Sequence, residues 1–284
     1  MPSGEPPAGA PEAGHLPFAP IPVWEALKAG FNAFYGDLNS FFIAARVWVA
    51  VLAILDTLIL WGAHAMDPES VSGFALAVGI VRIIATAAFL VAWHRHILLN
   101  AEIDVKRPVT VGRREWRFII YELAPAALAA VVAVASFILP MSGVIVAVGA
   151  VIVLVISVRW MLFAPLAALD IPGNLLAHSW KLSRGNGLRL FGGIVLMALL
   201  VIIPFALLDG LYYALAGSRV SSGLILNLVY SFAAETLNFA VLAWGAGFLC
   251  HSFAAIMQRT LPLDPNDKGI FPAAPGAKPP GARR

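Results

Sequence analysis

The sequence predicts an all-α integral membrane protein with six transmembrane helices, two interfacial amphipathic helices and both termini in the cytoplasm. Hydrophobic residues make up 60% of the chain and charged residues only 12%, whereas soluble globular domains carry about 25% charged residues. The apolar residues also gather in runs of about 20 or more, the length that a helix needs to cross the hydrocarbon core. A membrane β-barrel would instead show alternating segments of about ten residues.

Three segments are predicted along the chain. Residues 1–22 and 261–284 are rich in Pro, Ala and Gly and flank a helical membrane domain over residues 23–260. Tails of this composition bury too little apolar surface to fold, so both are predicted to be disordered. The first tail also lacks the apolar core of a signal peptide, so insertion is expected to rely on the first span.

The membrane domain begins with an amphipathic helix over residues 23–38, in which Trp24, Leu27, Phe31 and Phe34 recur at three- and four-residue steps. Such a helix either lies in the membrane interface or packs on its own bundle, and the spacing leaves both interpretations open. Six spans are then predicted over residues 41–61, 71–94, 116–139, 143–169, 188–216 and 224–257. Candidate breaks or kinks within them are Pro125, Pro165 and Pro204.

The distribution of Lys and Arg predicts the orientation. Outside the spans these residues gather before the first span, in the links between spans two and three and between spans four and five, and in the final tail. The links on the opposite side contain a single basic residue, Arg219. Since positively charged loops stay in the cytoplasm, both termini are predicted to be cytoplasmic.

A second amphipathic helix is predicted over residues 173–184, ended by the Gly and Asn residues at 185–187 that tolerate the conformation of a helix stop. The candidate interface and lipid-headgroup residues in and after it are Trp180, Lys181, Arg184, Asn186 and Arg189. Anionic headgroups attract such cations. Topology determination with tryptophan anchoring explains the same residues, and the sequence leaves both interpretations open.

Charged residues inside spans are costly and mark a candidate intramembrane charge network. Its members are Arg46, Asp56, Arg82, Glu122, Arg159 and Glu235. Arg82 and Glu235 both lie roughly 15 to 18 Å from the far side of the membrane at 1.5 Å per residue, and Asp56 is within reach of a long arginine side chain. Two interpretations stand: ion pairs that fix helix register, or ionisable groups of a transporter.

No cofactor, metal or catalytic site is predicted. Cys250 is the single cysteine, and His94 and His96 alternate on different faces of a helix, so they are predicted to be interfacial histidines rather than ligands of one metal. The motifs of metalloproteases, serine hydrolases and nucleotide-binding loops are missing. The basic residues sit in short loops between spans, which argues against nucleic-acid binding.

A stretch of about 35 residues resembles a known group of proteins. It runs from Arg159 and Trp160 through Asp170, the segment Ser179-Trp180-Lys181-Leu182 and Arg184-Gly185-Asn186 to Arg189-Leu190-Phe191. This pattern is similar to that of bacterial multi-span inner-membrane proteins, including the membrane domain fused to some glycerophosphodiester phosphodiesterases. The resemblance implies a helical inner-membrane domain without an activity to carry over, since the phosphodiesterase barrel itself has no counterpart in this chain.

Together these observations predict a non-enzymatic protein with a membrane-organising, lipid-interacting or partner-assembling role. A small-solute or lipid transporter that uses the intramembrane charges is the alternative, and an intramembrane enzyme is the third interpretation. The expected partners are membrane lipids, anionic headgroups among them. A membrane protein partner and a homo-oligomer both stay open.

Overall fold

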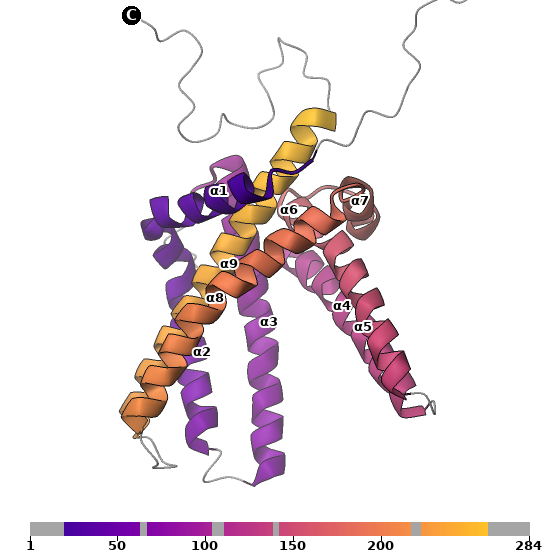
Figure 1. Cartoon of the computed structure of the whole chain (residues 1–284). Helices are drawn as coiled ribbons and strands as arrows, with labels where there is room; N and C mark the ends of the chain where they lie inside the picture. Colours follow the sequence, from indigo (N-terminus) through magenta and orange to yellow (C-terminus); the bar gives the residue numbers. More distant parts are fainter. Residues whose placement is uncertain (1–19, 63–66, 104–110, 139–141, 217–222, 261–284) are drawn as a thin grey trace, which may run out of the picture.

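The computed structural model describes residues 20–62, 67–103, 111–138, 142–216 and 223–260, and every regular element in these ranges is an α-helix (Figure 1). The helices are α1 (Val23–Gly36), α2 (Leu38–Gly62), α3 (Pro68–Leu99), α4 (Arg113–Ile138), α5 (Ser142–Trp160), α6 (Phe163–Ala168), α7 (Leu175–Leu182), α8 (Gly187–Ala216) and α9 (Leu224–Thr260). Most of the first predicted tail and all of the second lie outside the described residues.

Six helical stretches are long and apolar enough to cross a membrane. They are Leu38–Gly62, Glu69–Leu99, Arg113–Ala135, Val146–Ala168, Gly187–Ala216 and Leu224–Met257. The predicted all-helical architecture with six spans is confirmed. A multi-pass membrane protein needs such segments, because a helix satisfies its backbone hydrogen bonds within itself.

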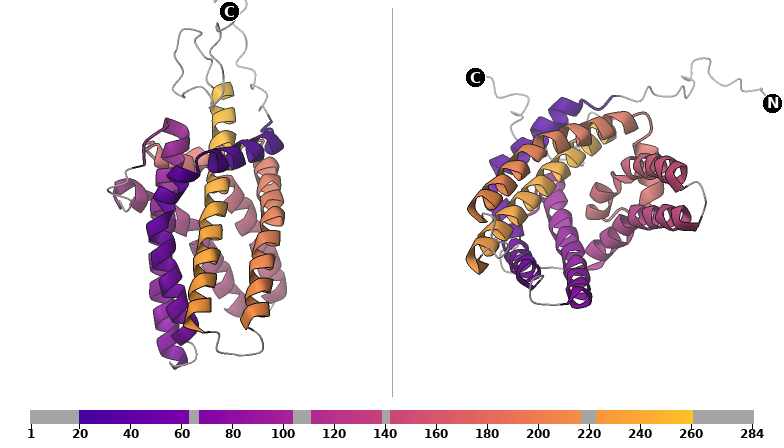
Figure 2. Two further views of the ribbon diagram at one scale, coloured as in Figure 1. Left: turned by 90° about the vertical axis from the view of Figure 1, so that its left-hand side faces the viewer. Right: turned by 60° about the horizontal axis from the view of Figure 1, so that its bottom comes forward.

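The short helices gather at one end of the long ones. Helices α1, α6 and α7 lie at that end, and the α2–α3, α4–α5 and α8–α9 hairpins all turn at the opposite end (Figures 1 and 2). The two helices predicted as amphipathic, α1 and α7, therefore lie on the same side of the molecule.

Helix α9 is the central element of the bundle. Half of its most apolar stretch is buried (50%), whereas only 11% of the corresponding stretches of α4 and α8 is buried. The Trp244 side chain on α9 donates from Nε1 to the carbonyl of Leu27 on α1 at 2.9 Å. In turn, Nε1 of Trp93 on α3 donates to the carbonyl of Ala243 on α9 at 3.0 Å. These bonds fix both neighbours against α9 at defined heights.

Helix α1 packs across α9 through a face of small residues. Its buried residues are Ala26, Leu27 and Gly30, and a Cβ atom at Gly30 would lie 2.5 Å from the backbone nitrogen of Phe248. The aromatic side chains of Trp24, Phe31 and Tyr35 stay exposed. Packing on the bundle and exposure of aromatic side chains thus occur together on one helix, and the ring of Phe31 also meets that of Trp244 on α9 edge-on at 5.6 Å.

The fourth predicted span, 143–169, is present and is interrupted near its end, beside Pro165, one of the three predicted candidate breaks. Helix α5 ends at Trp160, and α6 begins at Phe163 after a short turn. Pro165 has no backbone N–H for the bond to the carbonyl of Met161, and its ring would clash with that carbonyl in a continuous helix. The other two candidate break positions lie inside α4 and α8, which continue through their prolines.

The second surface helix is shorter than predicted. Helix α7 begins at Leu175 because the side-chain oxygen of Asn174 accepts hydrogen bonds from the N–H groups of Leu176 and Ala177, which is an N-cap. Gly173 before it has a φ of +91° and Gly185 after it a φ of +78°, values that glycine adopts without strain. The predicted helix stop at 185–187 is therefore misplaced: α7 already ends at Leu182 with Ser183 as its C-cap, and Gly187 is the first residue of α8.

Candidate functional site

Arg82 lies between two carboxylates from neighbouring spans. Its Nη1 donates to Oε1 of Glu235 on α9 at 2.6 Å, and its Nη2 donates to both carboxylate oxygens of Asp56 on α2 at 2.8 and 2.9 Å. The pairing of Arg82 with Glu235 that was inferred from their equal depth is therefore present in the structure. We call Asp56, Arg82 and Glu235 the charge triad.

The charge triad has an excess of acidic groups. With all three side chains ionised, two carboxylates face one guanidinium, and the second carboxylate oxygen of Glu235 is buried without a hydrogen-bond partner among the described residues. The Glu235 side chain is 6% exposed, whereas that of Arg82 is 35% exposed. The arrangement can fix the register of α2, α3 and α9 relative to one another. Because there is one carboxylate more than there are cations, one of the two carboxylates can also accept a proton.

The three other charges of the predicted network do not join the triad. Arg46 is exposed on α2. The guanidinium carbon of Arg159 lies 5.4 Å from the ring centroid of Trp180 on α7, which is a cation–π contact. Glu122 lines a cavity on the other side of α3 from α2. Their positions along the spans already set them apart from the triad: Arg46, for example, lies about 15 Å along α2 from Asp56 at 1.5 Å per residue.

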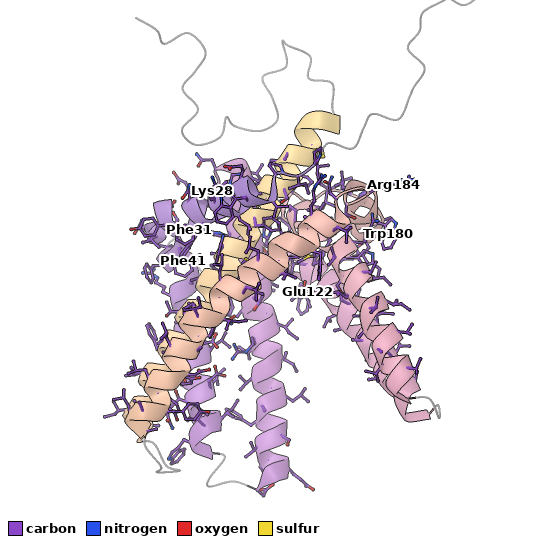
Figure 3. The ribbon with its side chains drawn as sticks, in the orientation of Figure 1. Lys28, Phe31, Phe41, Glu122, Trp180 and Arg184 are labelled. Atoms are coloured by element: carbon purple, nitrogen blue, oxygen red, sulfur yellow. The ribbon has the colours of Figure 1, made fainter. Side chains whose placement is uncertain are left out.

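The side chains of four residues in and after α7 are exposed, and we call them together the basic surface: Trp180, Lys181, Arg184 and Arg189. Trp180 is 44% exposed, and Figure 3 shows it beside Arg184 at the edge of the molecule, at the end where α1 lies. Within the described part of the chain, the cations of the basic surface make no salt bridge to a carboxylate. Their charge is therefore available to an anion from outside.

Asn186 does not belong to the basic surface, contrary to the prediction. It is 2% exposed, and its side-chain oxygen accepts a hydrogen bond from the backbone N–H of Ile21 at 3.0 Å. A contact from Nη1 of Arg189 reaches the same oxygen at 3.5 Å. Asn186 thus ties the start of α1 to the turn before α8 and is not accessible to lipid headgroups.

Two buried serines hold the basic surface in place. The hydroxyls of Ser179 and Ser183 both donate to the carbonyl of Arg159, at 2.8 and 3.1 Å. This carbonyl lies at the end of α5, where the helix has no further turn to satisfy it. Sequence analysis missed this role, since a serine on a polar helix face gives no sign of a partner 20 residues away.

Arginines in the first turns of α4 and near the end of α3 are already occupied. Arg117 donates to Oδ1 of Asp170 at 2.9 Å and to the carbonyl of Ile171 at 2.8 Å, and Arg114 lies 3.6 Å from the same carboxylate. Arg95 donates to the carbonyl of Ala168 at 3.0 Å. These cations fix the junction between α6 and α7, which sets them apart from the unpaired cations of the basic surface.

A cavity of about 440 Å³ lies between α3, α4, α5, α6, α8 and α9. Its walls are mainly apolar, and the ionisable groups among its lining residues are His94 and Glu122. Glu122 is exposed, whereas His94 is 1% exposed. The prediction that His94 is an interfacial histidine is therefore wrong: its position on α3 faces α4 and α6 rather than the membrane surface.

His96 joins α3 to the junction of α1 and α2. Its Nε2 lies 2.9 Å from Oδ2 of Asp37, and its Nδ1 lies 3.0 Å from the carbonyl of Ala101. Burial raises the pKa of the Asp37 carboxyl, but hydrogen bonds from Ser40 and His96 outweigh burial and hold this pKa below its usual value. The contact thus favours the ionised form of Asp37 at the end of the bundle where α1 lies.

In the described ranges, no group of three or more His, Cys, Asp or Glu side chains is placed to hold a metal ion. The single cysteine, Cys250, is buried in the core. No family model, curated protein or solved structure matches the chain. The geometry of the basic surface, the charge triad and the cavity is therefore the basis for a function.

Proposed function

We propose that this protein is a non-enzymatic multi-pass protein of a bacterial inner membrane that binds anionic lipid headgroups through the basic surface. The observation that carries the proposal is the contrast between two sets of cations at the same end of the bundle. Arg114 and Arg117 are paired with Asp170, whereas Lys181 and Arg184 are exposed without an acidic partner in the described residues.

The basic surface suits a lipid headgroup for three reasons. Each Lys or Arg close to an anionic membrane contributes about 1 kcal/mol of attraction. The exposed ring of Trp180 favours the boundary between hydrocarbon and headgroups. The hydrogen bonds from Ser179 and Ser183 to Arg159 hold the cations in one place, so binding a headgroup requires little further ordering of the backbone.

The cytoplasmic location of this surface is part of the proposal. Positive residues gather at the end of the bundle that holds α1 and α7, which favours the cytoplasm for that end. The exposed aromatic face of α1, with Trp24, Phe31 and Tyr35, supports an interfacial position for this helix. The resemblance to bacterial multi-span membrane domains agrees with this location and stays a prediction.

Titration of phosphatidylglycerol into the detergent-solubilised protein, followed by native mass spectrometry, tests the proposal. The triple variant K181Q/R184Q/R189Q should weaken lipid binding by up to about 3 kcal/mol, roughly a hundredfold in Kd. The helical content of the triple variant should be unchanged, because none of the three side chains is buried.

Lys28→Gln is the matched control. Lys28 is an exposed cation at the same end of the molecule, but it is paired with Glu25 at 2.9 Å, so its loss should leave phosphatidylglycerol binding unchanged. Equal lipid retention by the native protein and the triple variant would contradict the proposed headgroup site. A loss of equal size in K28Q and K181Q would instead point to nonspecific attraction.

Transport of a small solute or lipid is the second candidate, favoured by the acidic excess of the charge triad and the unpartnered oxygen of Glu235. A charge swap separates transport from a structural role. If the triad only fixes register, R82E/E235R in a D56N background, where position 56 no longer opposes the swapped carboxylate, should recover the stability that R82Q or E235Q loses in the same background, as measured by denaturant titration in detergent. Recovery would reject the transport interpretation, and its failure would favour it.

A further inference from the structure

Two side chains that line the cavity, His94 and Glu122, offer hydrogen-bond acceptors, and Ser157 and Trp160 also belong to its lining. Nδ1 of His94 lies 2.7 Å from the carbonyl of Leu90, and a carbonyl only accepts, so Nδ1 carries the proton of the neutral ring. Nε2 is then left with a free lone pair. It is buried and has no hydrogen-bond partner in the described residues, which is costly unless a donor reaches it.

Glu122 presents a second acceptor to the same cavity. Figure 3 shows Glu122 on the side of α4 that faces α3, and its carboxylate makes no salt bridge or hydrogen bond within the described chain. It lies roughly 13 Å along α4 from Arg113, the first residue of that helix, at 1.5 Å per residue. An unpaired carboxylate at such a depth in a membrane is unfavourable and calls for a cationic partner.

The walls of the cavity define the rest of the ligand. Leu90, Phe118, Ile194, Phe248 and Leu249 are among the apolar side chains that enclose it. Its volume of about 440 Å³ falls within the range of roughly 300 to 1,000 Å³ that holds small organic ligands. Apolar walls with two acceptors match an apolar body that carries a hydrogen-bond-donating cation.

We propose that this cavity binds a cationic amphiphile, an alkyl chain with an ammonium headgroup. The ammonium donates to the Glu122 carboxylate at the exposed mouth and to Nε2 of His94 further inside, and the chain lies against the apolar walls. An ammonium has three donors and no acceptor, so it satisfies both groups and neutralises the carboxylate at the same time. An alcohol has a single donor, so it satisfies only one of the two acceptors and leaves the charge, and a fatty acid adds a second negative charge.

Photo-crosslinking with a dodecylamine that carries a diazirine in its chain tests the site. The probe is added to the full-length protein in nanodiscs of phosphatidylcholine, and labelled peptides are identified by mass spectrometry. Labelling should fall on the cavity walls, on Trp160 to Ala164 above all, and E122Q should reduce it about tenfold, because the variant replaces a charge-assisted bond with a neutral one. Glu69→Gln, which removes an exposed carboxylate at the opposite end of α3, should leave labelling unchanged.

Competition by unlabelled compounds identifies the headgroup that is recognised. Dodecylamine should displace the probe at about a tenfold lower concentration than dodecanol or dodecanoate. Equal competition by the alcohol would overturn recognition of the cation, and labelling confined to peptides outside the cavity would overturn the site. Equal labelling of the native protein and E122Q would also overturn it, and because glutamine keeps the size of the exposed side chain, misfolding does not obscure that result.

Discussion

Arg82 is the side chain on which three spans converge, so its replacement should destabilise the bundle more than the loss of either carboxylate alone. R82Q leaves Asp56 and Glu235 ionised side by side without a cation. Breaking a buried ion pair in this way costs about 3 kcal/mol or more. D56N should cost less, since Arg82 keeps its 2.6 Å contact with Glu235.

Unfolding in a denaturing detergent, followed by circular dichroism, measures this order. Arg46→Gln is the control, because Arg46 is exposed on α2 and has no hydrogen bond or salt bridge among the described residues. The free energy of unfolding of R46Q should stay within about 0.5 kcal/mol of the native value. A cost for D56N as large as that for R82Q would mean that the pair with Glu235 contributes little.

The contact between Asp37 and His96 makes an acid-sensitive contribution at the α1 end of the bundle. Since the pKa of Asp37 is lower in the folded protein than its usual value of 3.8, its stabilisation is present above that value and is lost as the pH falls through the folded pKa. The stability difference between the native protein and D37N should therefore be constant down to about pH 5 and shrink below about pH 4.

Thermal unfolding over this pH range measures the difference. The difference in free energy of unfolding between the native protein and D37N should be at most about 1 kcal/mol, because the Asp37 side chain is 40% exposed and water screens the contact. A difference that grows as the pH falls would contradict the assigned direction of the shift.

Position along a helix was predictable for single residues, but position around it was not. Counting residues along the spans brings Arg82 and Glu235 to one depth, and few other partners exist for a charge in lipid. Asn186 shows the limit, because its polar side chain in a basic segment suggested exposure. Its partner, the N–H of Ile21, lies 165 positions away in the chain, and no local pattern reports that contact.

Among the helices, the crossing of α1 and α9 depends on two glycines. A Cβ atom at Gly30 would lie 2.8 Å from the carbonyl carbon of Gly247, and one at Gly247 would lie 2.6 Å from the Cα of Gly30. These atoms belong to the backbone and cannot rotate away. Gly30→Ala should therefore separate the two helices and cost about 2 kcal/mol, within the range for overpacking.

Gly36→Ala is the matched control for this crossing, since a Cβ at Gly36 meets nothing within 4 Å and alanine favours the helix. Thermal unfolding should show a lower melting temperature for G30A and an equal or higher one for G36A. Equal melting temperatures for G30A and the native protein would mean that α1 does not pack tightly on α9.

The elements themselves were predictable to the extent that apolar length determines them. The six spans follow from hydropathy, because a helix in lipid needs no partner to satisfy its backbone. The break between Trp160 and Phe163 was only partly predictable, since three prolines offered the same signal and α4 and α8 continue through theirs. The crossing of α1 on α9 was not, because Gly247 lies far from Gly30 in the chain.

At the scale of the whole molecule, the bundle is asymmetric. Helix α9 packs against α2, α3 and α8, whereas the α4–α5 hairpin diverges from them toward the end opposite α1 (Figure 1). The exposed side chains of this hairpin are almost entirely apolar, with Val131, Val134, Val148, Val151 and Val155 among them.

Orientation is the property of the whole molecule that decides what the basic surface meets, and the native chain makes it simple to measure. Cys250 is 1% exposed, so a membrane-impermeant maleimide should not react with it, and single cysteines can be added to the native background. Arg184→Cys reports the end that holds α7, and Gly143→Cys, at an exposed position where α5 begins, reports the opposite end.

In sealed vesicles, R184C should react only when the cytoplasmic face is outside, and G143C only when the opposite face is outside. The reason is the charge distribution: moving the basic links across the membrane is opposed far more strongly than moving the short links that contain only Arg219. The native protein should stay unlabelled in both preparations. The reverse pattern would place the basic surface away from the cytoplasmic leaflet and its anionic lipids, and labelling of both variants from one side would contradict a membrane-crossing α5.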